Sequence, residues 1–392
     1  MKRNRKIWIL AVAILIIGFI ACVKKYDPPA IKASNRYLVV DGVINTGANG
    51  ITTFNLSRSR NLSDTVSFIP ELGAHLSIIS AAGNTYPMLD TSNTGKYTSA
   101  ILNLTMNDQY ALAITTSDGH LYQSAFVSPK ATAPIDSVTW KQSVVNNGVT
   151  INVSTHDPSN STHYYRWDYS ETWQHNAPEQ AYWVLINGMV TPLGADFTND
   201  PNQTHQCYTT APASNITVAN SLGLSQDVIS FQPITFIPFN NERITIRYSI
   251  LVNQYAITED AYQYWLLFQN NSQTLGSLFD LLPSQLNSNI HSLNYPSEPV
   301  IGFISACSVQ QKRLFITNDQ VAGNWVKIEP HNECSTITIP TDPNNFEIYN
   351  YEDTSYTPWY FTGNNIPFLI IVKKECVDCR TQEGTNAKPS FW

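Results

Sequence analysis

The stretch Asp108-Gln-Tyr-Ala-Leu-Ala-Ile-Thr115 sets the fold class of the first third of this chain. Tyr110, Leu112 and Ile114 lie at every second position, which is the side-chain period of a β-strand. The Asp-x-Tyr pattern at the strand entrance resembles a tyrosine corner, in which the phenol oxygen bonds to nearby backbone in β-sandwiches.

The same alternation continues on both sides of this stretch, with Gly, Asn and Asp turns between the segments. It predicts strands at Tyr37–Ile44, Ile51–Ser57, His75–Ser80, Thr85–Leu89, Lys96–Leu104, Gln109–Thr115 and Leu121–Val127. Short strands at this spacing predict a β-sandwich of immunoglobulin-like or transthyretin-like type over residues 36–127.

Residues 128–134 interrupt the pattern with two prolines and small side chains, which predicts a linker. Beyond it, alternation resumes and predicts a larger β-rich domain over residues 135–392, so that the chain is mainly β. Its expected strands are Ile135–Lys141, Val149–Ser154, Tyr164–Ser170, Gln180–Ile186, Asn215–Val218, Ile229–Pro233, Arg243–Val252, Val300–Ala306, Arg313–Ile316 and Pro367–Val372.

One helical insertion is expected in this second domain, at residues 259–273. Thr258 supplies a capping hydroxyl, and the two acidic residues that follow suit a helix N-terminus. Ala261, Trp265 and Phe268 then fall at helical spacing.

Residues 1–21 predict a signal peptide for export. Four positive charges precede an apolar run that is too short to span a bilayer comfortably, and a small residue comes directly before Cys22. A cysteine in that place is typical of a bacterial lipoprotein, in which Cys22 becomes the acylated N-terminus, for example with palmitate. The alternative is an uncleaved anchor helix. Residues 22–35 are polar and contain Pro28-Pro29, which predicts a tether.

The charge balance excludes some partners. The chain carries 23 basic and 30 acidic residues, and loss of the leader with Lys2, Arg3, Arg5 and Lys6 leaves 19 basic residues and a net charge of −11. Nucleic acid and anionic lipid both require basic patches, so neither is an expected partner. Charged residues make up only 14% of the chain, a composition that suits exported β-proteins.

Five of the six cysteines follow Cys22, so an oxidising compartment would leave at least one unpaired. Cys307 ends an apolar segment and is the expected buried, free thiol. Cys207, Cys334, Cys376 and Cys379 are the disulfide candidates. We expect Cys334 to lie within bonding reach of the Cys376-x-x-Cys379 pair, and the other thiol of that pair to be left for Cys207.

Two alternatives remain for these cysteines. His331, Cys334, Cys376 and Cys379 have the spacing of zinc ligands, but exported thiols tend to be oxidised and to pair. A redox role for the Cys-x-x-Cys pair would require its first thiol at a helix N-terminus. The two aromatic residues that end the tail predict that it folds back and packs.

An aromatic stripe occupies the odd positions of residues 163–173, including Tyr165, Trp167, Tyr169 and Trp173. Side chains at alternate positions of a strand share one face. Such a row could form a platform for a glycan or peptide, or the inner face of a sandwich. The core interpretation is favoured, because large aromatic side chains dominate cores.

His156, Asp157 and His163 are the candidate acid–base groups of an enzyme, but only proximity in sequence links them. The Asp157-Pro158 segment is first of all a turn between strands. The sequence contains no nucleophile elbow, phosphate-binding glycine loop or His-Glu-x-x-His motif, and it indicates no cofactor.

Four features together span nearly the whole mature chain. They are Cys22 followed by Tyr37-Leu-Val-Val-Asp-Gly42, the Asp157-Pro158 turn before Tyr164-Tyr-Arg-Trp167, the helix start Thr258-Glu-Asp-Ala-Tyr-Gln-Tyr-Trp265, and the ending Cys376-x-x-Cys379 with Lys388-Pro-Ser-Phe-Trp392. In these features the chain resembles domain-of-unknown-function family 4249, lipoproteins of Bacteroidetes-type Gram-negative bacteria. The resemblance implies a partner of TonB-dependent outer-membrane receptors and supplies no catalytic residues.

Three functions follow as hypotheses. The first is a non-enzymatic binding or accessory module, lipid-anchored to the outer membrane through Cys22 and linked to TonB-dependent nutrient uptake. The second is a surface enzyme acting on glycan or peptide. The third is an adhesin-like structural spacer, which would lack a pocket.

Overall fold

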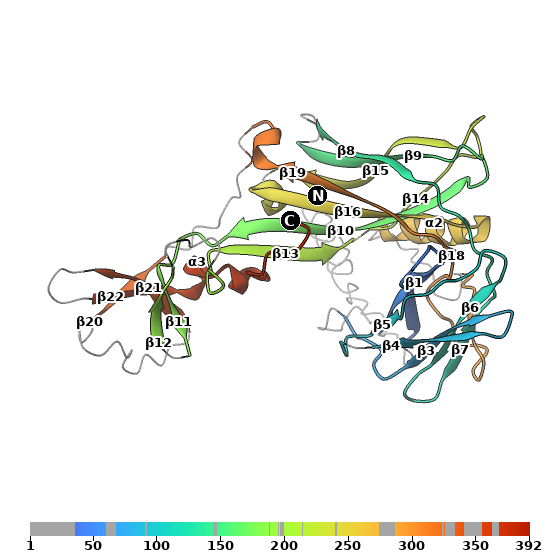
Figure 1. Ribbon diagram of the computed structural model, residues 1–392, viewed down its shortest axis with the longest axis horizontal. Coiled ribbons are helices and arrows are strands. Elements are labelled where there is room, and N and C mark those ends of the chain that lie inside the picture. Colours follow the sequence, from blue (N-terminus) through green and yellow to red (C-terminus); the bar gives the residue numbers. More distant parts are fainter. Residues whose placement is uncertain are drawn as a thin grey trace, which may run out of the picture.

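The computed structural model of the protein describes residues 36–59, 68–90, 92–143, 147–187, 189–194, 196, 200–213, 215–239, 241–273, 287–323, 325, 334–340, 355–362 and 368–392. Within these residues the chain is mainly β, as predicted, and its sheets form two sandwiches and a smaller lobe (Figure 1).

The first sandwich is built from a nine-stranded sheet in the order β17-β7-β6-β3-β4-β5-β2-β1-β18. Its strands are β1 (Leu38–Asn45), β2 (Thr53–Arg58), β3 (His75–Ser80), β4 (Thr85–Leu89), β5 (Lys96–Ser99), β6 (Tyr110–Thr115), β7 (Leu121–Ser124), β17 (Ile290–Ser292) and β18 (Ala306–Cys307). Buried side chains from β1 to β7 and β17 form one hydrophobic cluster, so the sheet curls over on itself to enclose a core. All seven strands predicted in this region are present.

The tyrosine corner is present as predicted. The hydroxyl of Tyr110 donates a hydrogen bond to the carbonyl oxygen of Thr105 at 3.0 Å and accepts one from the backbone N–H of Thr105 at 2.8 Å. The ring itself is buried in the core, so the corner ties the entrance of β6 to the preceding loop.

The first sandwich also takes in residues distant in sequence, which the boundary at residue 127 did not foresee. β17 pairs with β7, and β18 runs parallel to β1. The predicted strand over residues 300–306 is wrong in detail. This segment runs alongside β1 and is joined to it by isolated backbone hydrogen bonds, such as the one from Val40 N–H to Ile301 O. Only its end forms a strand, β18. Residues 128–134 are packed against it, since the Lys130 N–H donates to Ala306 O at 2.9 Å.

The second sandwich packs a five-stranded sheet on a three-stranded one. The five-stranded sheet has the order β13 (Gln206–Pro212), β10 (Tyr164–Asn176), β16 (Arg247–Ala256) and β19 (Gln310–Thr317), and β14 (Thr217–Asn220) also pairs with β10. The three-stranded sheet has the order β15 (Val228–Pro238), β9 (Gly148–His156) and β8 (Ile135–Ser143). All pairings are antiparallel, and side chains such as Trp167, Ile151 and Ile237 form the core between the sheets. The 3-10 turn η1 (Glu242–Ile244) lies between β15 and β16, and the 3-10 turn η3 (Asn318–Gln320) follows β19.

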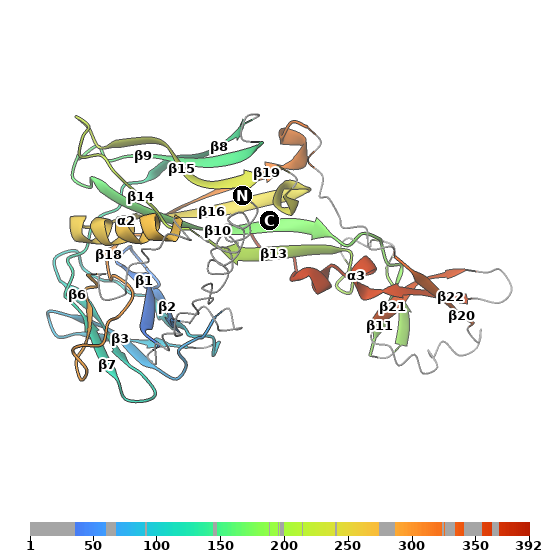
Figure 2. The same cartoon turned by 180° about the vertical axis from the view of Figure 1, so that it is seen from behind.

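The predicted helix has the predicted bounds, α2 (Glu259–Gln273). The hydroxyl of Thr258 accepts from the Ala261 N–H at 3.2 Å, which satisfies one free donor of the first turn. Trp265 joins Val43 and Phe303 of the first sandwich in one buried cluster. The helix therefore lies where the two sandwiches meet, as both views show (Figures 1 and 2).

A smaller lobe projects from the end of β10 and β13 (Figures 1 and 2). It contains the sheet β20 (Thr336–Pro340), β22 (Phe368–Lys373) and β21 (Tyr356–Thr362), the hairpin β11 (Trp183–Ile186) and β12 (Met189–Pro192), the short helix α3 (Lys374–Val377) and the turn η4 (Cys379–Gln382). The sequence predicted β22 and β11, whereas β12, β13, β20 and β21 were not predicted.

Candidate binding groove between the two sandwiches

A groove of about 1300 Å³ runs between the two sandwiches. One wall is the outer face of β1 and β2, and the other is formed by β10 and β16. Leu38 and Val40 point into the first core, so Val39 and Asp41 at the alternate positions face the groove. The pleat of the strand thus gives β1 one core face and one binding face.

The wall from the second sandwich follows the same rule. Tyr165 and Trp167 point into the core, while Arg166 and Asp168 lie on the opposite face of β10 and line the groove. The sequence analysis missed this pair, because it followed the aromatic positions only. The available signal was two opposite charges at even positions of an otherwise aromatic strand.

Arg166 is the central charged group of the groove, and only 4% of its side chain is exposed. Its Nη2 lies 3.3 Å from Asp41 Oδ1 of the first sandwich and 3.7 Å from Asp168 Oδ2. The guanidinium carbon lies 4.0 Å from the ring centroid of Trp265. Nε and Nη1 have no hydrogen-bond partner among the described residues, so two carboxylates and an aromatic face hold the cation.

Burial and charge act against each other in this cluster. Burial opposes the charge of Arg166, but the carboxylates of Asp41 and Asp168 outweigh it and raise the pKa of Arg166 above its ordinary value. Burial raises the pKa of Asp168, and Arg166 and Asn253 offset only part of that effect. Arg166 therefore stays charged and links the two sandwiches.

The lining of the groove mixes apolar and charged side chains. It combines apolar side chains such as Val39, Ile51 and Phe68 with the charged groups above, and it contains no histidine or cysteine among the described residues. Open grooves with apolar and hydrogen-bonding walls are common sites for extended segments.

The aromatic stripe is core, so its interpretation as a binding platform is wrong. Tyr165, Trp167, Tyr169 and Trp173 are between 0 and 7% exposed and belong to the core of the second sandwich. The indole of Trp167 donates to Gln254 Oε1 at 2.8 Å. The three-stranded sheet covers this face of β10 and leaves no ring free to stack on a ligand.

The side chains of the two candidate histidines bond to different partners. His156 is half exposed, with Nδ1 2.8 Å from Asp136 Oδ2, and that contact raises its pKa. His163 instead has Nδ1 3.3 Å from Ser221 Oγ. Partial burial raises the pKa of Asp157, but hydrogen bonds from Ser159 and Ser161 outweigh it and lower the pKa well below its ordinary value. None of the candidates lines the groove.

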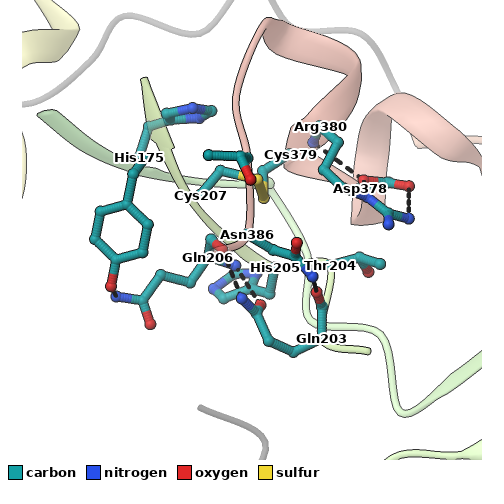
Figure 3. The surroundings of a disulfide bond; sticks show 12 residues. His175, Gln203, Thr204, His205, Gln206, Cys207, Asp378, Cys379, Arg380 and Asn386 are labelled. Carbon is teal, nitrogen blue, oxygen red and sulfur yellow. Dashed lines mark hydrogen bonds and ion pairs between the residues drawn. A yellow bond between two sulfur atoms is a disulfide. The ribbon is translucent and has the colours of Figure 1, made fainter. Parts of the chain in front are cut away.

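The cysteines pair as the sequence predicted. Cys334 is bonded to Cys376 with a Cα–Cα distance of 5.9 Å, and Cys207 is bonded to Cys379 with a Cα–Cα distance of 5.7 Å (Figure 3). Cys307 is free and buried, and burial raises the pKa of its thiol to about 12. The zinc alternative is wrong, because disulfide sulfurs are not thiolate ligands. The redox alternative fails as well, since Cys376 and Cys379 bond to distant partners.

Other sequence predictions fall beyond the described structure. Cys22, the leader, the tether and His331 lie outside the described residues. In the described parts of the chain, no three His, Cys, Asp or Glu side chains are grouped as ligands for a metal ion. The described segments also contain no helix that is long and apolar enough to cross a membrane.

Comparisons with known proteins identify a family but not an activity. Residues 23–313 match the family described as "Domain of unknown function (DUF4249)". No curated protein matches the chain. A solved two-domain fibronectin type-III segment of chicken tenascin is similar at 14% identity over 56% of this chain and 89% of that chain, with a TM-score of 0.15. A likeness that slight carries no argument, so the fold described above rests on the sheets themselves.

Proposed function

This chain belongs to the DUF4249 family of domains of unknown function, and from that premise we propose that it is a lipid-anchored binding protein and not an enzyme. It is exported, held on the outer membrane by acylated Cys22, and serves as an accessory module of a TonB-dependent nutrient-uptake system.

The groove between the sandwiches is the observation that carries this proposal. It offers about 1300 Å³ between two β-sheet walls and is bridged by the ion pair of the buried Arg166 with the exposed Asp41. Its shape and mixed lining suit an extended segment of a partner protein, whose side chains would contact the apolar and charged groups of the two walls. His156 and His163 bond to different partners and none of the three candidate groups lines the groove, so the enzyme alternative gains no support from their contacts.

Two features support the proposed location. The two disulfides suit an oxidising, extracytoplasmic compartment, where such bonds form and persist. The leader that ends at Cys22 supplies an acylation site, and several acyl chains on one residue are enough for stable membrane anchoring.

Co-purification from native membranes tests the function and the groove together. Tagged wild-type protein is expected to enrich a TonB-dependent receptor. Asn55→Arg places a bulky charge on an exposed groove position of β2 and should reduce that enrichment several-fold. Thr85→Arg is the matched control, because Thr85 is an exposed strand residue of the same sandwich outside the groove.

Two outcomes would count against the proposal. Wild-type protein that never enriches a receptor would refute the accessory role. Equal enrichment by Asn55→Arg and wild-type protein would keep the role but remove the groove as its site.

A further inference from the structure

A second cavity, of about 500 Å³, lies where the C-terminal lobe joins the second sandwich. Its walls come from β11, β21 and β22, from α3 and η4, and from the loop around Thr204. Val377 and Asp378 line it, and both are flanked by disulfide cysteines, Cys376 and Cys379. The two disulfides therefore hold together the chain segments that form the cavity.

The cavity has an apolar wall and a polar wall. The apolar wall contains the buried side chains of Val184, Ile371 and Val377. The polar wall includes Thr204 and Asn386, which lie together beside the Cys207–Cys379 disulfide (Figure 3). A volume between about 300 and 1,000 Å³ with this mixed lining is typical of small-molecule sites.

The charged groups of the lining leave one positive charge in excess. Lys374, Asp378 and Arg380 are the only charged residues that line the cavity in the described part of the chain. Arg380 is neutralised, since its Nε and Nη2 bond to the two carboxylate oxygens of Asp378 at 2.8 and 2.7 Å (Figure 3). The ammonium of Lys374 makes no ion pair or side-chain hydrogen bond with the described residues.

We propose that this cavity binds a small amphipathic carboxylate. The carboxylate pairs with the Lys374 ammonium, and the apolar body packs against Val184, Ile371 and Val377. A cation that has no ion-pair partner among the described residues, beside an apolar wall, provides both halves of such a ligand's surface with a partner. The proposal does not rest on the function proposed for the groove, because the two sites share no residue.

Isothermal titration with octanoate, octanol and acetate tests the proposal on the intact, oxidised protein. Wild-type protein is expected to bind octanoate at least about tenfold more tightly than octanol, because only octanoate gains the charge-assisted contact. Acetate lacks the apolar body and should bind much more weakly than octanoate.

Lys374→Met removes the charge and keeps the length of the side chain. It should weaken octanoate binding by about tenfold or more, down to the level of octanol, and leave octanol binding unchanged. The unchanged octanol binding shows that the cavity is still folded. Lys373→Met is the matched control, because Lys373 precedes Lys374 directly, lies outside the cavity and pairs with Glu375 at the surface.

Four results would overturn the proposal. The first three are no measurable octanoate binding by wild-type protein, equal binding of octanoate and octanol, and octanoate binding that survives Lys374→Met. Equal affinity for acetate and octanoate would also refute it, since the apolar wall would then contribute nothing.

Discussion

At the scale of single residues, neighbouring positions have very different roles in this protein. Trp167 is a core side chain, whereas Arg166 beside it bridges two sandwiches. Asp157 holds a turn through its carboxylate, and Cys307 is a buried thiol that takes part in no disulfide. In each case the contacts of the folded chain assign the role, and the residue type only limits the choice.

Cys22→Ser is expected to abolish acylation and release the protein from the membrane fraction, because serine offers no thiol to the lipid-transfer step. Fractionation and mass determination of wild-type and variant protein measure this. A variant that stays in the membrane at mature size would contradict the lipoprotein assignment.

Asp157→Ala is expected to lower the free energy of unfolding by about 1–2 kcal/mol at pH 7, because the turn loses its side-chain caps. In wild-type protein the carboxylate accepts from the backbone N–H groups of Ser159, Ser161 and Thr162. Urea unfolding of both proteins gives the difference.

The difference in unfolding free energy between wild-type and Asp157→Ala protein should decrease as the pH falls. Because the folded-state pKa of Asp157 is lowered, the unfolded chain binds the proton first as the pH falls. The stabilisation is complete above the ordinary carboxyl pKa of about 4 and is lost progressively toward the lowered value. The gap between wild-type and variant protein should therefore shrink at about pH 2.5. An unchanged gap would show that the charge is irrelevant.

At the scale of elements, β10 shows how one strand serves two environments. It is longer than the predicted Tyr164–Ser170 and extends to Asn176, because its second half pairs with β13 and β16. One face packs on the three-stranded sheet, and the other forms a wall of the groove. The strand therefore couples the second core to the candidate binding surface.

Substitutions on the two faces of β10 should have unequal effects. Trp167→Ala removes a fully buried indole and is expected to cost about 3–5 kcal/mol of unfolding free energy. Ser170→Ala changes a groove residue on the opposite face of the same strand and should stay within about 0.5 kcal/mol. Denaturant titration compares them, and a small effect of Trp167→Ala would contradict its place in the core.

At the scale of the whole molecule, two late segments of the chain pack against parts formed by earlier residues. Residues 290–307 complete the sheet of the first sandwich. The tail folds back as predicted. The centroid of the Trp392 ring lies 5.3 Å from that of Tyr208 and 5.8 Å from that of Phe315. The backbone of Thr385 is hydrogen-bonded to the backbone of Tyr208. These returns join the two sandwiches and the lobe into one assembly.

Removal of one disulfide should loosen the lobe and spare the sandwiches. Cys334→Ser together with Cys376→Ser is expected to destabilise the lobe by about 3–4 kcal/mol, because the bond closes a long loop of the unfolded chain. Hydrogen exchange should show lost protection in β20 to β22, with β10 and β16 unchanged. Unaltered protection of the lobe would contradict the prediction.

The sequence by itself determined those features that depend on local pattern. Two-residue periodicity located β3 and β4 without error, and a capping hydroxyl with helical spacing located α2. The Asp-x-Tyr pattern predicted the corner at Tyr110, and cysteine spacing together with compartment predicted the bridge from Cys334 to the Cys-x-x-Cys pair. Each of these rests on contacts between near neighbours or on chemistry that holds wherever the segment lies.

Only the tertiary structure decided which face of each strand is covered and by what. The alternation in β10 is equally compatible with an exposed or a buried aromatic stripe. The stripe is buried because the three-stranded sheet packs on that face of β10. Pairing of β17 and β18 with strands far back in the sequence leaves no local signal, because the bonds join residues more than a hundred positions apart. The groove around Arg166 and the cavity beside Lys374 arise from the same long-range packing, so periodicity alone does not reveal them.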